Sequence, residues 1–321
     1  MSYPFFLTVQ DDFQAVNRLI RENLASEVPL VEEIAKYLVS AGGKRLRPLL
    51  VLLSCLSCGY GGREHVKLAA VIEFLHTAML LHDDVVDASA LRRGRKTVNA
   101  AWGNPASVLV GDFLHSRAFE MMVEIGDMKV MQILSRATNI IAEGEVQQLA
   151  HVGNISTTEA DYMQIIRRKT AMLFQASSHA GAVLARADDK VELALKRFGQ
   201  HLGMAFQLVD DQLDYAGDTA RLGKNVGDDL HEGKVTLPLI IAMREGSDDQ
   251  RCYIGEAINA RGASDLGKVI ATVRTTGGLE YTCKVAKKEQ QLALDCLGCV
   301  ADSEHKSALQ SLAEFAVARQ H

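Results

Sequence analysis

Apolar residues recur along most of the chain with the 3.6-residue period of an α-helix, and the alternation typical of β-strands is nearly absent. The helical period is clearest over residues 66–86 and 130–149. Pro48, Pro105 and Pro238 each open an apolar stretch, where proline suits the first turn of a helix. The pattern therefore predicts an all-α fold of about a dozen helices joined by short connections.

The longest predicted helices are apolar around much of their circumference, which indicates burial inside the protein or against a second subunit. No linker, low-complexity tract or internal repeat divides the chain. Residues 1–321 are therefore predicted to form a single domain. The more polar residues 246–321 are a candidate peripheral helical cap within it.

Charge and cysteine content narrow the class of protein. The net charge of −5 excludes the basic face that nucleic-acid binding requires, so an anionic substrate would have to be attracted locally. The most apolar run, residues 48–58, is too short to cross a bilayer, and the first residues do not resemble a secretory signal. Two CxxC pairs, in residues 55–58 and 296–299, are interpreted as buried free cysteines in apolar helices and not as a zinc site. We therefore expect a cytoplasmic protein.

Two acidic clusters carry the strongest chemical signal. DDVVD at residues 83–87 and DDQLD at residues 210–214 each follow a long apolar helical stretch. The first and fifth aspartates of each cluster share one helix face, and the second lies on the flank. Like charges at this spacing repel, and Mg²⁺ with a substrate phosphate would relieve the repulsion. A single cluster could be a solvated helix end, but two identical clusters indicate metal sites. The candidate metal ligands are Asp83, Asp84, Asp87, Asp210, Asp211 and Asp214.

Basic segments accompany both clusters. GGKRLRP at residues 42–48 combines glycines with an arginine suited to a phosphate, and RRGR at residues 92–95 follows the first cluster. Lys224 and Lys234 bracket the segment after the second cluster. Each segment alone could be a helix end with cations near its carbonyl groups. Together they indicate recognition of diphosphate groups.

Other phosphate and hydrolase motifs are missing from the sequence. It contains no GxxxxGK[ST] loop, no GxGxxG after a strand and no serine-triad motif. Metal ions and arginines are therefore left to stabilise a departing diphosphate. The apolar helices before the clusters would enclose a hydrocarbon tail. A diphosphate head on a hydrocarbon tail indicates a prenyl diphosphate substrate.

Several stretches resemble the trans-prenyl diphosphate synthases in wording and order. They are GGKRLRP, LLHDDVVD followed by LRRG, RRKTAMLF, and FQLVDDQLDY followed by LGKNVGDDLHEGKVTLP, which together cover residues 42–238. ASVLVGDF and AEGEVQQL are closest to the wording of bacterial octaprenyl diphosphate synthases. The resemblance implies an all-α homodimer with a deep central cavity. It also implies repeated condensation of isopentenyl diphosphate onto an allylic diphosphate such as farnesyl diphosphate, giving octaprenyl diphosphate for a quinone side chain.

The resemblance also implies cofactors and residue roles. Three Mg²⁺ ions would be held with substrate, with Mn²⁺ able to substitute, and the lipid product would pass to membrane enzymes. Asp83, Asp84, Asp87 and Asp210 would bind metal at the allylic diphosphate, with Asp211 and Asp214 behind Asp210. Arg92, Lys169, Lys224 and Lys234 would contact the allylic diphosphate. Lys44, Arg47, His76 and Arg93 would hold isopentenyl diphosphate. Thr170 and Gln207 would face the developing cation.

Product length is expected to depend on the helix that precedes the first cluster. Ala78 and Met79 lie five and four positions before Asp83, and a small residue at 78 leaves the tail cavity open. Met121, Met122 and Met131 are candidate residues for the cavity floor, although methionines at helical spacing are more often ordinary core residues. The open position at Ala78 predicts a long product.

Several alternatives remain open, a non-enzymatic helical scaffold among them. Within the class, the product could be shorter (geranylgeranyl) or longer (solanesyl). A terpene cyclase would normally carry a different second metal motif. A non-catalytic subunit of a heteromeric synthase would normally lack one aspartate cluster. An HD-type phosphohydrolase is suggested by His82-Asp83, but no set of further histidine ligands accompanies that pair.

Overall fold

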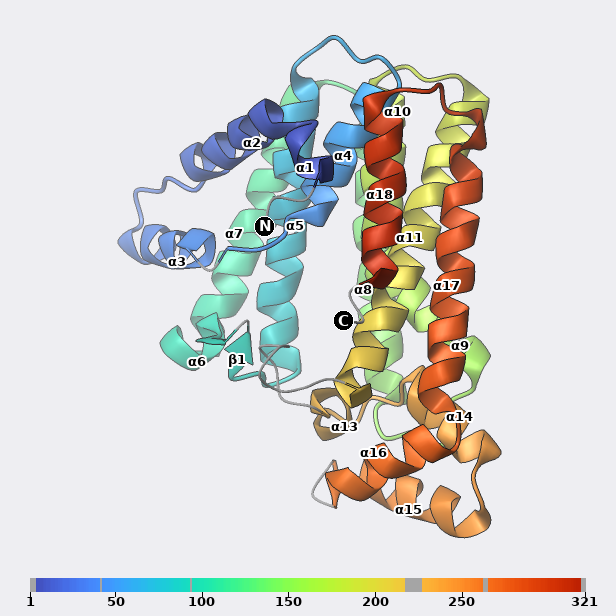
Figure 1. The fold of residues 1–321 in the computed structure, drawn as a ribbon. Helices are drawn as coiled ribbons and strands as arrows, with labels where there is room; N and C mark the ends of the chain where they lie inside the picture. The colour runs from blue at the N-terminus through green and yellow to red at the C-terminus, as the bar shows by residue number, and fades with distance from the viewer. Residues whose placement is uncertain (1–3, 41, 93, 217–226, 262–264, 319–321) are drawn as a thin grey trace. The chain divides into compact units, whose positions relative to one another are not determined.

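A computed structural model of the chain describes residues 4–40, 42–92, 94–216, 227–261 and 265–318 (Figure 1). The elements of its N-terminal half are α1 (Pro4–Leu7), α2 (Gln10–Asn23), α3 (Pro29–Ser40), α4 (Leu46–Ser57), α5 (Glu64–Val86), β1 (Leu91–Arg92), β2 (Arg95–Lys96), α6 (Val98–Trp102), α7 (Asn104–Ile125) and α8 (Met128–His151). Those of its C-terminal half are α9 (Glu159–Ile166), the π-helical segment η1 (Arg167–Ala171), α10 (Met172–Leu184), α11 (Asp189–Ala216), α13 (Asp228–His231), α14 (Leu237–Glu245), α15 (Asp248–Asn259), α16 (Leu266–Thr275), α17 (Gly278–Cys296), the 3₁₀ segment η2 (Leu297–Cys299) and α18 (Glu304–Ala318).

The all-α prediction is confirmed. The described residues form more helices than the predicted dozen, and their one β element is a hairpin of two short antiparallel strands, β1 and β2. Apolar periodicity could not predict this hairpin, because its strands have two residues each. No described helix is both long and apolar enough to cross a membrane.

The chain divides into two compact units, each built from several segments. The first unit contains residues 1–138, 173–199 and 296–312, and the second contains residues 139–172, 200–295 and 313–321. Helices α8, α11 and α18 each contribute residues to both units. Residue 246, the start of the predicted cap, lies inside the second unit, so the single domain with a cap stays a prediction.

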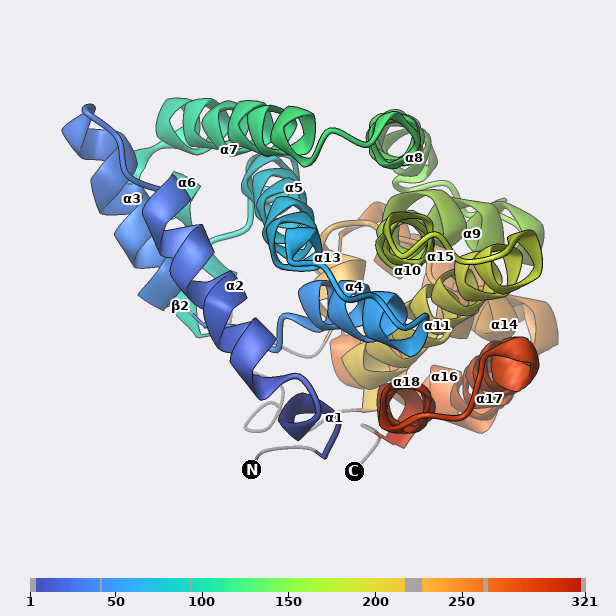
Figure 2. The ribbon, with the colours of Figure 1, turned by 90° about the horizontal axis from the view of Figure 1, so that it is seen from above.

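Helix α5 is the centre of the first unit, where it packs against α2, α4 and α7 (Figure 2). Its buried residues occur on every side of the helix, as expected for a helix at the centre of its unit. Helix α7 runs antiparallel to it: the Ser107 hydroxyl donates to the Leu81 carbonyl (2.8 Å), and Lys67 pairs with Glu124 (3.2 Å). Gly111 permits the close approach, because a Cβ there would lie 2.3 Å from His82 Nε2.

The core of the second unit is formed by apolar side chains of α9, α11, α14, α15, α16 and α17. Helix α9 begins with a capping box between Thr158 and Asp161. The helix then continues through the π-helical segment η1 into α10, so the helical path over residues 159–184 contains one wide turn. A π-helical turn of this kind is rare and is often found at functional sites.

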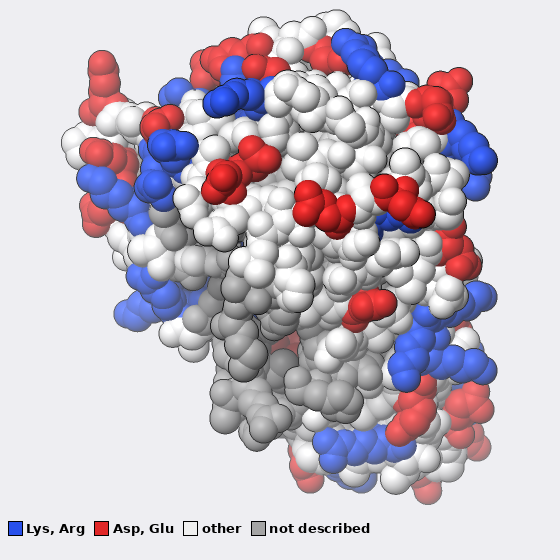
Figure 3. All heavy atoms as spheres, turned by 45° about the horizontal axis from the view of Figure 1, so that its top comes forward, with Lys and Arg blue, Asp and Glu red and all other residues white. Residues whose placement is uncertain are grey.

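The charged side chains show no single-sign field on the face drawn in Figure 3. Lys and Arg side chains there are interspersed with Asp and Glu side chains around broad uncharged areas. This mixed surface agrees with the modest net charge of −5. Attraction of an anionic substrate therefore has to come from local groups.

Candidate active site

The first aspartate cluster lies at the C-terminal end of α5. Asp83 and Asp87 are half-buried and one turn apart, whereas Asp84 is only 3% exposed. Asp84, which was expected on the flank of the cluster, is thus buried, whereas Asp83 and Asp87 are partly open to solvent. The two half-buried carboxylates share a helix face, and the third is turned into the first unit.

Asp84 is held by Arg92 of strand β1. Both Nε and Nη2 of Arg92 donate to Asp84 Oδ1, at 2.9 and 2.7 Å. Burial opposes the charge of Arg92, yet the hydrogen bonds to Asp84 and the nearby charges of Asp83 and Asp87 raise its pKa above the ordinary value. The hairpin missed by periodicity therefore places a permanent cation directly beside the cluster.

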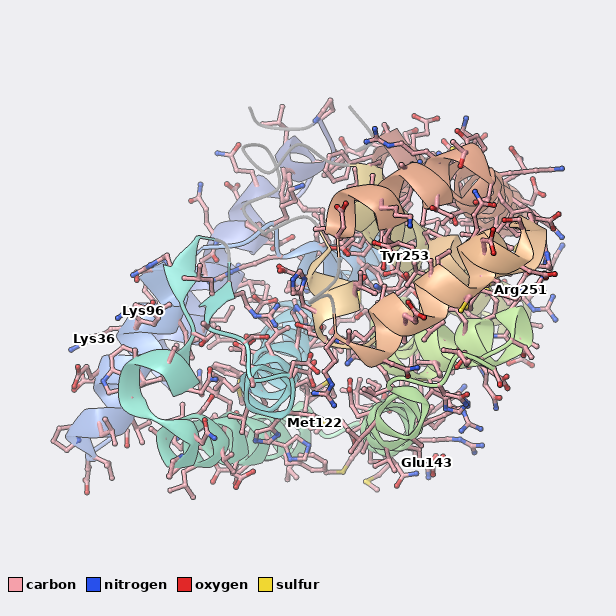
Figure 4. All side chains as sticks on the ribbon, turned by 90° about the horizontal axis from the view of Figure 1, so that it is seen from below. Lys36, Lys96, Met122, Glu143, Arg251 and Tyr253 are labelled. Atoms are coloured by element: carbon pink, nitrogen blue, oxygen red, sulfur yellow. The ribbon has the colours of Figure 1, made fainter. Side chains whose placement is uncertain are left out.

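A pocket in the first unit joins several predicted residues. Gly42, His76, Asp84 and Arg92 line it together with apolar side chains of α2, α3, α5 and α7. The sequence had not singled out the polar lining residues Tyr37, Glu73 and Lys96, whereas Arg45 and Arg95 belong to the two basic segments. Lys96 lies with Lys36 at the outer edge of this unit (Figure 4), and the Tyr37 hydroxyl donates to the Lys96 carbonyl (2.6 Å).

Arg47 and His76 form a contact of their own in the first unit. Arg47 Nη1 lies 3.1 Å from His76 Nε2, and the guanidinium stacks over the Phe174 ring at 4.3 Å. A ring under a guanidinium fixes its plane, which suits directional binding of an anion. Lys44, in the same glycine-rich segment, is exposed. Arg93 lies outside the described residues.

The second aspartate cluster lies near the C-terminal end of α11. Asp210 and Asp214 are half-buried, and Asp211 is 3% exposed, so the burial repeats that of the first cluster. The holding groups differ, because Asp211 accepts from the Tyr162 hydroxyl at 2.5 Å and from Gln207 Nε2 at 2.6 Å. Burial and the charge of Asp229 raise the pKa of Asp211 to about 7, although both hydrogen bonds oppose the rise.

The segment after the second cluster is held to it by backbone groups. The Asp229 N–H donates to Asp214 Oδ2 (3.3 Å), and the Gly227 N–H donates to the Asp214 carbonyl (3.0 Å). Lys234 is half-buried and pairs with Glu232. Lys224 lies outside the described residues.

The π-helical segment η1 presents two further predicted residues, Lys169 and Thr170. Lys169 Nζ donates to Glu145 of α8 at 2.6 Å, and Thr170 Oγ1 donates to Gln207 Oε1 at 2.9 Å. Gly144 lets α8 approach this wide turn, because a Cβ there would lie 2.8 Å from the Lys169 backbone nitrogen. The sequence predicted Lys169, Thr170 and Gln207 only through the family resemblance.

The predicted product-length residues lie in the first unit. Ala78 and Met122 are buried, and Met79 is half-buried. Met122 belongs to α7 and is labelled in Figure 4. By the antiparallel pairing of α5 and α7, Met122 lies near the level of Ala69, because Lys67 pairs with Glu124.

The metal sites can be judged from the donors available. Among the described residues, no three His, Cys, Asp or Glu side chains gather into a ready-made metal cage. Each cluster instead offers two half-buried carboxylates one turn apart. This donor set fits Mg²⁺, which is usually bound by one or two carboxylates with water and substrate phosphate completing the shell.

Two residues with direct contacts to the site were missed. Tyr162 holds Asp211, and Glu145 holds Lys169. Neither residue stands in an acidic or basic cluster, so no local spacing marked them. Both residues lie on helices that carry several other polar side chains, so residue type did not mark them either.

A model of the polyprenyl synthetase family matches residues 28–275. The chain belongs to this family. It is 48% identical to the octaprenyl diphosphate synthase of Escherichia coli over 98% of this chain and 97% of that protein. It is 47% identical to the all-trans-nonaprenyl-diphosphate synthase (geranyl-diphosphate specific) of Rhodobacter capsulatus over 97% of this chain and 96% of that protein.

The fold is also that of solved family members. The polyprenyl synthase of Caulobacter crescentus, in complex with calcium and isoprenyl diphosphate, superposes with a TM-score of 0.96 at 43% identity and covers 99% of this chain and 98% of that one. The family, the isoprenoid synthase fold and the prenyltransferase class predicted from the sequence are therefore confirmed. This polyprenyl synthetase is a long-chain trans-polyprenyl diphosphate synthase.

Proposed function

We propose that this synthase is Mg²⁺-dependent and extends farnesyl diphosphate with isopentenyl diphosphate to octaprenyl diphosphate. The observation that carries the proposal is the repeated aspartate cluster, in which two half-buried carboxylates share a helix face and the third is buried. The similarity to octaprenyl diphosphate synthases supports the product assignment.

Asp83 with Asp87, and Asp210 with Asp214, would hold Mg²⁺ through their half-buried carboxylates. Bound Mg²⁺ would act as a Lewis acid toward the leaving diphosphate. That both clusters act on one diphosphate remains a prediction. Asp84 and Asp211 are proposed to stabilise the clusters without being the main metal ligands. Asp84 already accepts two hydrogen bonds from Arg92, and Asp211 accepts one each from Tyr162 and Gln207.

The basic residues fall into two groups, one in each compact unit. In the first unit, Arg47 and His76 are in contact, and the pocket beside them brings in Arg92. Arg47 and His76 are proposed to bind isopentenyl diphosphate together with Lys44 and Arg93, whereas Arg92 is proposed to bind the allylic diphosphate. In the second unit, Lys169 and Lys234 are proposed to bind the allylic diphosphate together with Lys224, each described lysine exchanging its present glutamate partner for phosphate.

Position 78 supports a long product, because its side chain is only a methyl group. From Asp83 to the level of Met122, near Ala69, is 14 residues, or about 21 Å along the helix. At about one isoprene unit per helical turn, a straight tail would carry about four units to that level. An eight-unit product therefore requires the tail to bend or to continue past Met122.

Self-association is proposed through the outer face of α7. Leu109 and Val123 are 65% and 63% exposed, and 14 residues place them on nearly the same helix face. Large exposed apolar side chains on one face indicate an interface, and a symmetric homodimer is its commonest form. Sedimentation should give a dimer mass for the unmodified chain and a lower mass for Leu109→Asp. A monomer for the unmodified chain would reject this part of the proposal.

The product assay tests the proposal. The purified chain is incubated with farnesyl diphosphate, labelled isopentenyl diphosphate and Mg²⁺, and the dephosphorylated products are resolved by length. Octaprenol is expected. Products ending at geranylgeraniol or solanesol would replace the product assignment.

The same assay separates the remaining alternatives. A 33% identical relative in Bacillus subtilis is component 2 of heptaprenyl diphosphate synthase. Activity of the purified chain alone would exclude dependence on a second component. Phosphate release from farnesyl diphosphate without isopentenyl diphosphate would favour a phosphohydrolase.

A further inference from the structure

A continuous hydrogen-bond chain joins four side chains of the second unit. The Tyr162 hydroxyl donates to Asp211 Oδ2 (2.5 Å), Gln207 Nε2 donates to Asp211 Oδ1 (2.6 Å), and Thr170 Oγ1 donates to Gln207 Oε1 (2.9 Å). The chain starts at α9, passes through α11 and ends in the π-helical segment η1. Its inner end is buried, with Tyr162 and Asp211 each 3% exposed, and its outer end at Thr170 is half-buried.

The direction of these bonds fixes the orientation of the Gln207 amide. Gln207 Nε2 donates to Asp211 Oδ1, so the amide oxygen of Gln207 faces Thr170 and accepts from its hydroxyl. The Thr170 hydroxyl proton is then committed to Gln207. The remaining lone pairs of Thr170 Oγ1 and Gln207 Oε1 are available to a positive charge, and no donor of this pair points toward it.

Without Tyr162, the Asp211 carboxylate would be held less firmly in its orientation. A buried carboxylate with a single donor retains a partly unsatisfied oxygen, which favours rotation of the carboxylate. Rotation moves Oδ1 away from the position in which it accepts from the Gln207 nitrogen. The Gln207 amide could then reverse and present its N–H groups on the side of Thr170.

We propose that Tyr162 is a positioning residue of the condensation, which acts through Asp211 to hold the oxygens of Gln207 and Thr170 toward the developing allylic cation. This inference rests on the proposed roles of Gln207 and Thr170. Tyr162 touches no substrate in it. Its contribution is a fixed dipole direction, which matters most when charge develops in the transition state.

The test compares Tyr162→Phe with Tyr281→Phe. Tyr281 is a matched control, because its hydroxyl also donates to a carboxylate of the same unit, that of Glu159, at 3.0 Å. Tyr162→Phe is expected to lower kcat about tenfold, with the KM of both diphosphates and the Mg²⁺ concentration for half-activation within about twofold of wild type. Tyr281→Phe is expected to leave all four quantities unchanged.

A double-mutant cycle decides whether Tyr162 acts through Gln207. Gln207→Leu is expected to lower kcat, and Tyr162→Phe added to it is expected to cause almost no further loss. Equal losses from Tyr162→Phe on both backgrounds, or an unchanged kcat in the single variant, would overturn the proposal. So would a shifted Mg²⁺ requirement, which would assign the effect to metal binding. If Tyr162→Phe does not fold, Asp211→Asn enters the same cycle with the same expected pattern.

The cycle also distinguishes this inference from the proposed function. If Gln207→Leu and Thr170→Val both retain wild-type kcat, the proposed roles fail and Tyr162 has nothing to position. If both lower kcat and Tyr162→Phe does not, only the positioning role of Tyr162 is lost.

Discussion

The two aspartate clusters have the same sequence pattern and the same burial, but different groups hold their buried members. Asp84 is bound by Arg92, a permanent cation, through two hydrogen bonds to one oxygen. Asp211 is bound by two neutral donors, Tyr162 and Gln207, through one hydrogen bond to each oxygen. The same sequence motif is therefore stabilised in two electrostatically different ways. The first design is the Arg92-bound cluster, and the second design is the cluster held by Tyr162 and Gln207. In the first, a cation faces the buried carboxylate, whereas in the second two neutral donors face it and the directions of their hydrogen bonds matter.

The half-buried aspartates should show the largest effects, because they are the proposed metal ligands in both designs. Asp83→Ala is expected to lower kcat about a thousandfold, through lost stabilisation of the leaving diphosphate. Asp210→Ala should do the same. Single-turnover rates with labelled isopentenyl diphosphate measure the loss. Asp248→Ala, a 98% exposed aspartate of α15, should retain the wild-type rate. A wild-type rate in Asp83→Ala would remove the first cluster from the metal site.

Product length should depend on the first unit alone. Ala78→Phe is expected to shorten the main product by several isoprene units, because a ring would close the face of α5 one turn before Asp83. Met122→Ala should shift the length less, since the tail has already bent or passed that level. Product sizing measures both, and melting temperatures confirm folding. An unchanged distribution in Ala78→Phe would refute the path along α5.

Removal of Arg92 should cost stability in the first design. Arg92→Ala leaves the 3% exposed Asp84 without its cation and is expected to lower the free energy of unfolding by about 2 kcal/mol. Urea unfolding of the substrate-free protein measures the change. Arg95→Ala is the control, because Arg95 bonds the exposed Ser40 hydroxyl and no carboxylate in the same hairpin region. Equal losses in the two variants would contradict a special role for the Arg92–Asp84 pair.

The second design should also change the pH dependence of stability. Asp211 retains its proton up to about pH 7 when folded, compared with an ordinary pKa of 3.8 when unfolded. The folded protein therefore binds more protons between these values, so its stability falls as the pH rises from about 4 to 7. Urea unfolding of metal-free protein should show this fall, and Asp211→Asn should remove most of it. Asp248→Asn should retain it, and a flat wild-type profile would argue against the raised pKa.

The sequence predicted the elements of this comparison unevenly. The spacing of apolar residues predicted the all-α fold. The spacing of the aspartates predicted both clusters and the flank positions of Asp84 and Asp211. The hairpin that carries Arg92 and the wide turn at Lys169 and Thr170 were not predicted, because elements of two to five residues leave no periodic signal. Tyr162 was missed for a different reason. It comes from a separate helix, and only the folded chain brings it to Asp211, 49 positions away in sequence.

Chain elongation by the purified protein is the most direct test of the proposed activity. Farnesyl diphosphate and labelled isopentenyl diphosphate are supplied with Mg²⁺ in one reaction and with a chelator in the other. Octaprenyl diphosphate in the first reaction and no elongation in the second are the expected results. Elongation that persists without the metal, or no elongation with it, would contradict a Mg²⁺-dependent prenyl synthase built on these two aspartate clusters.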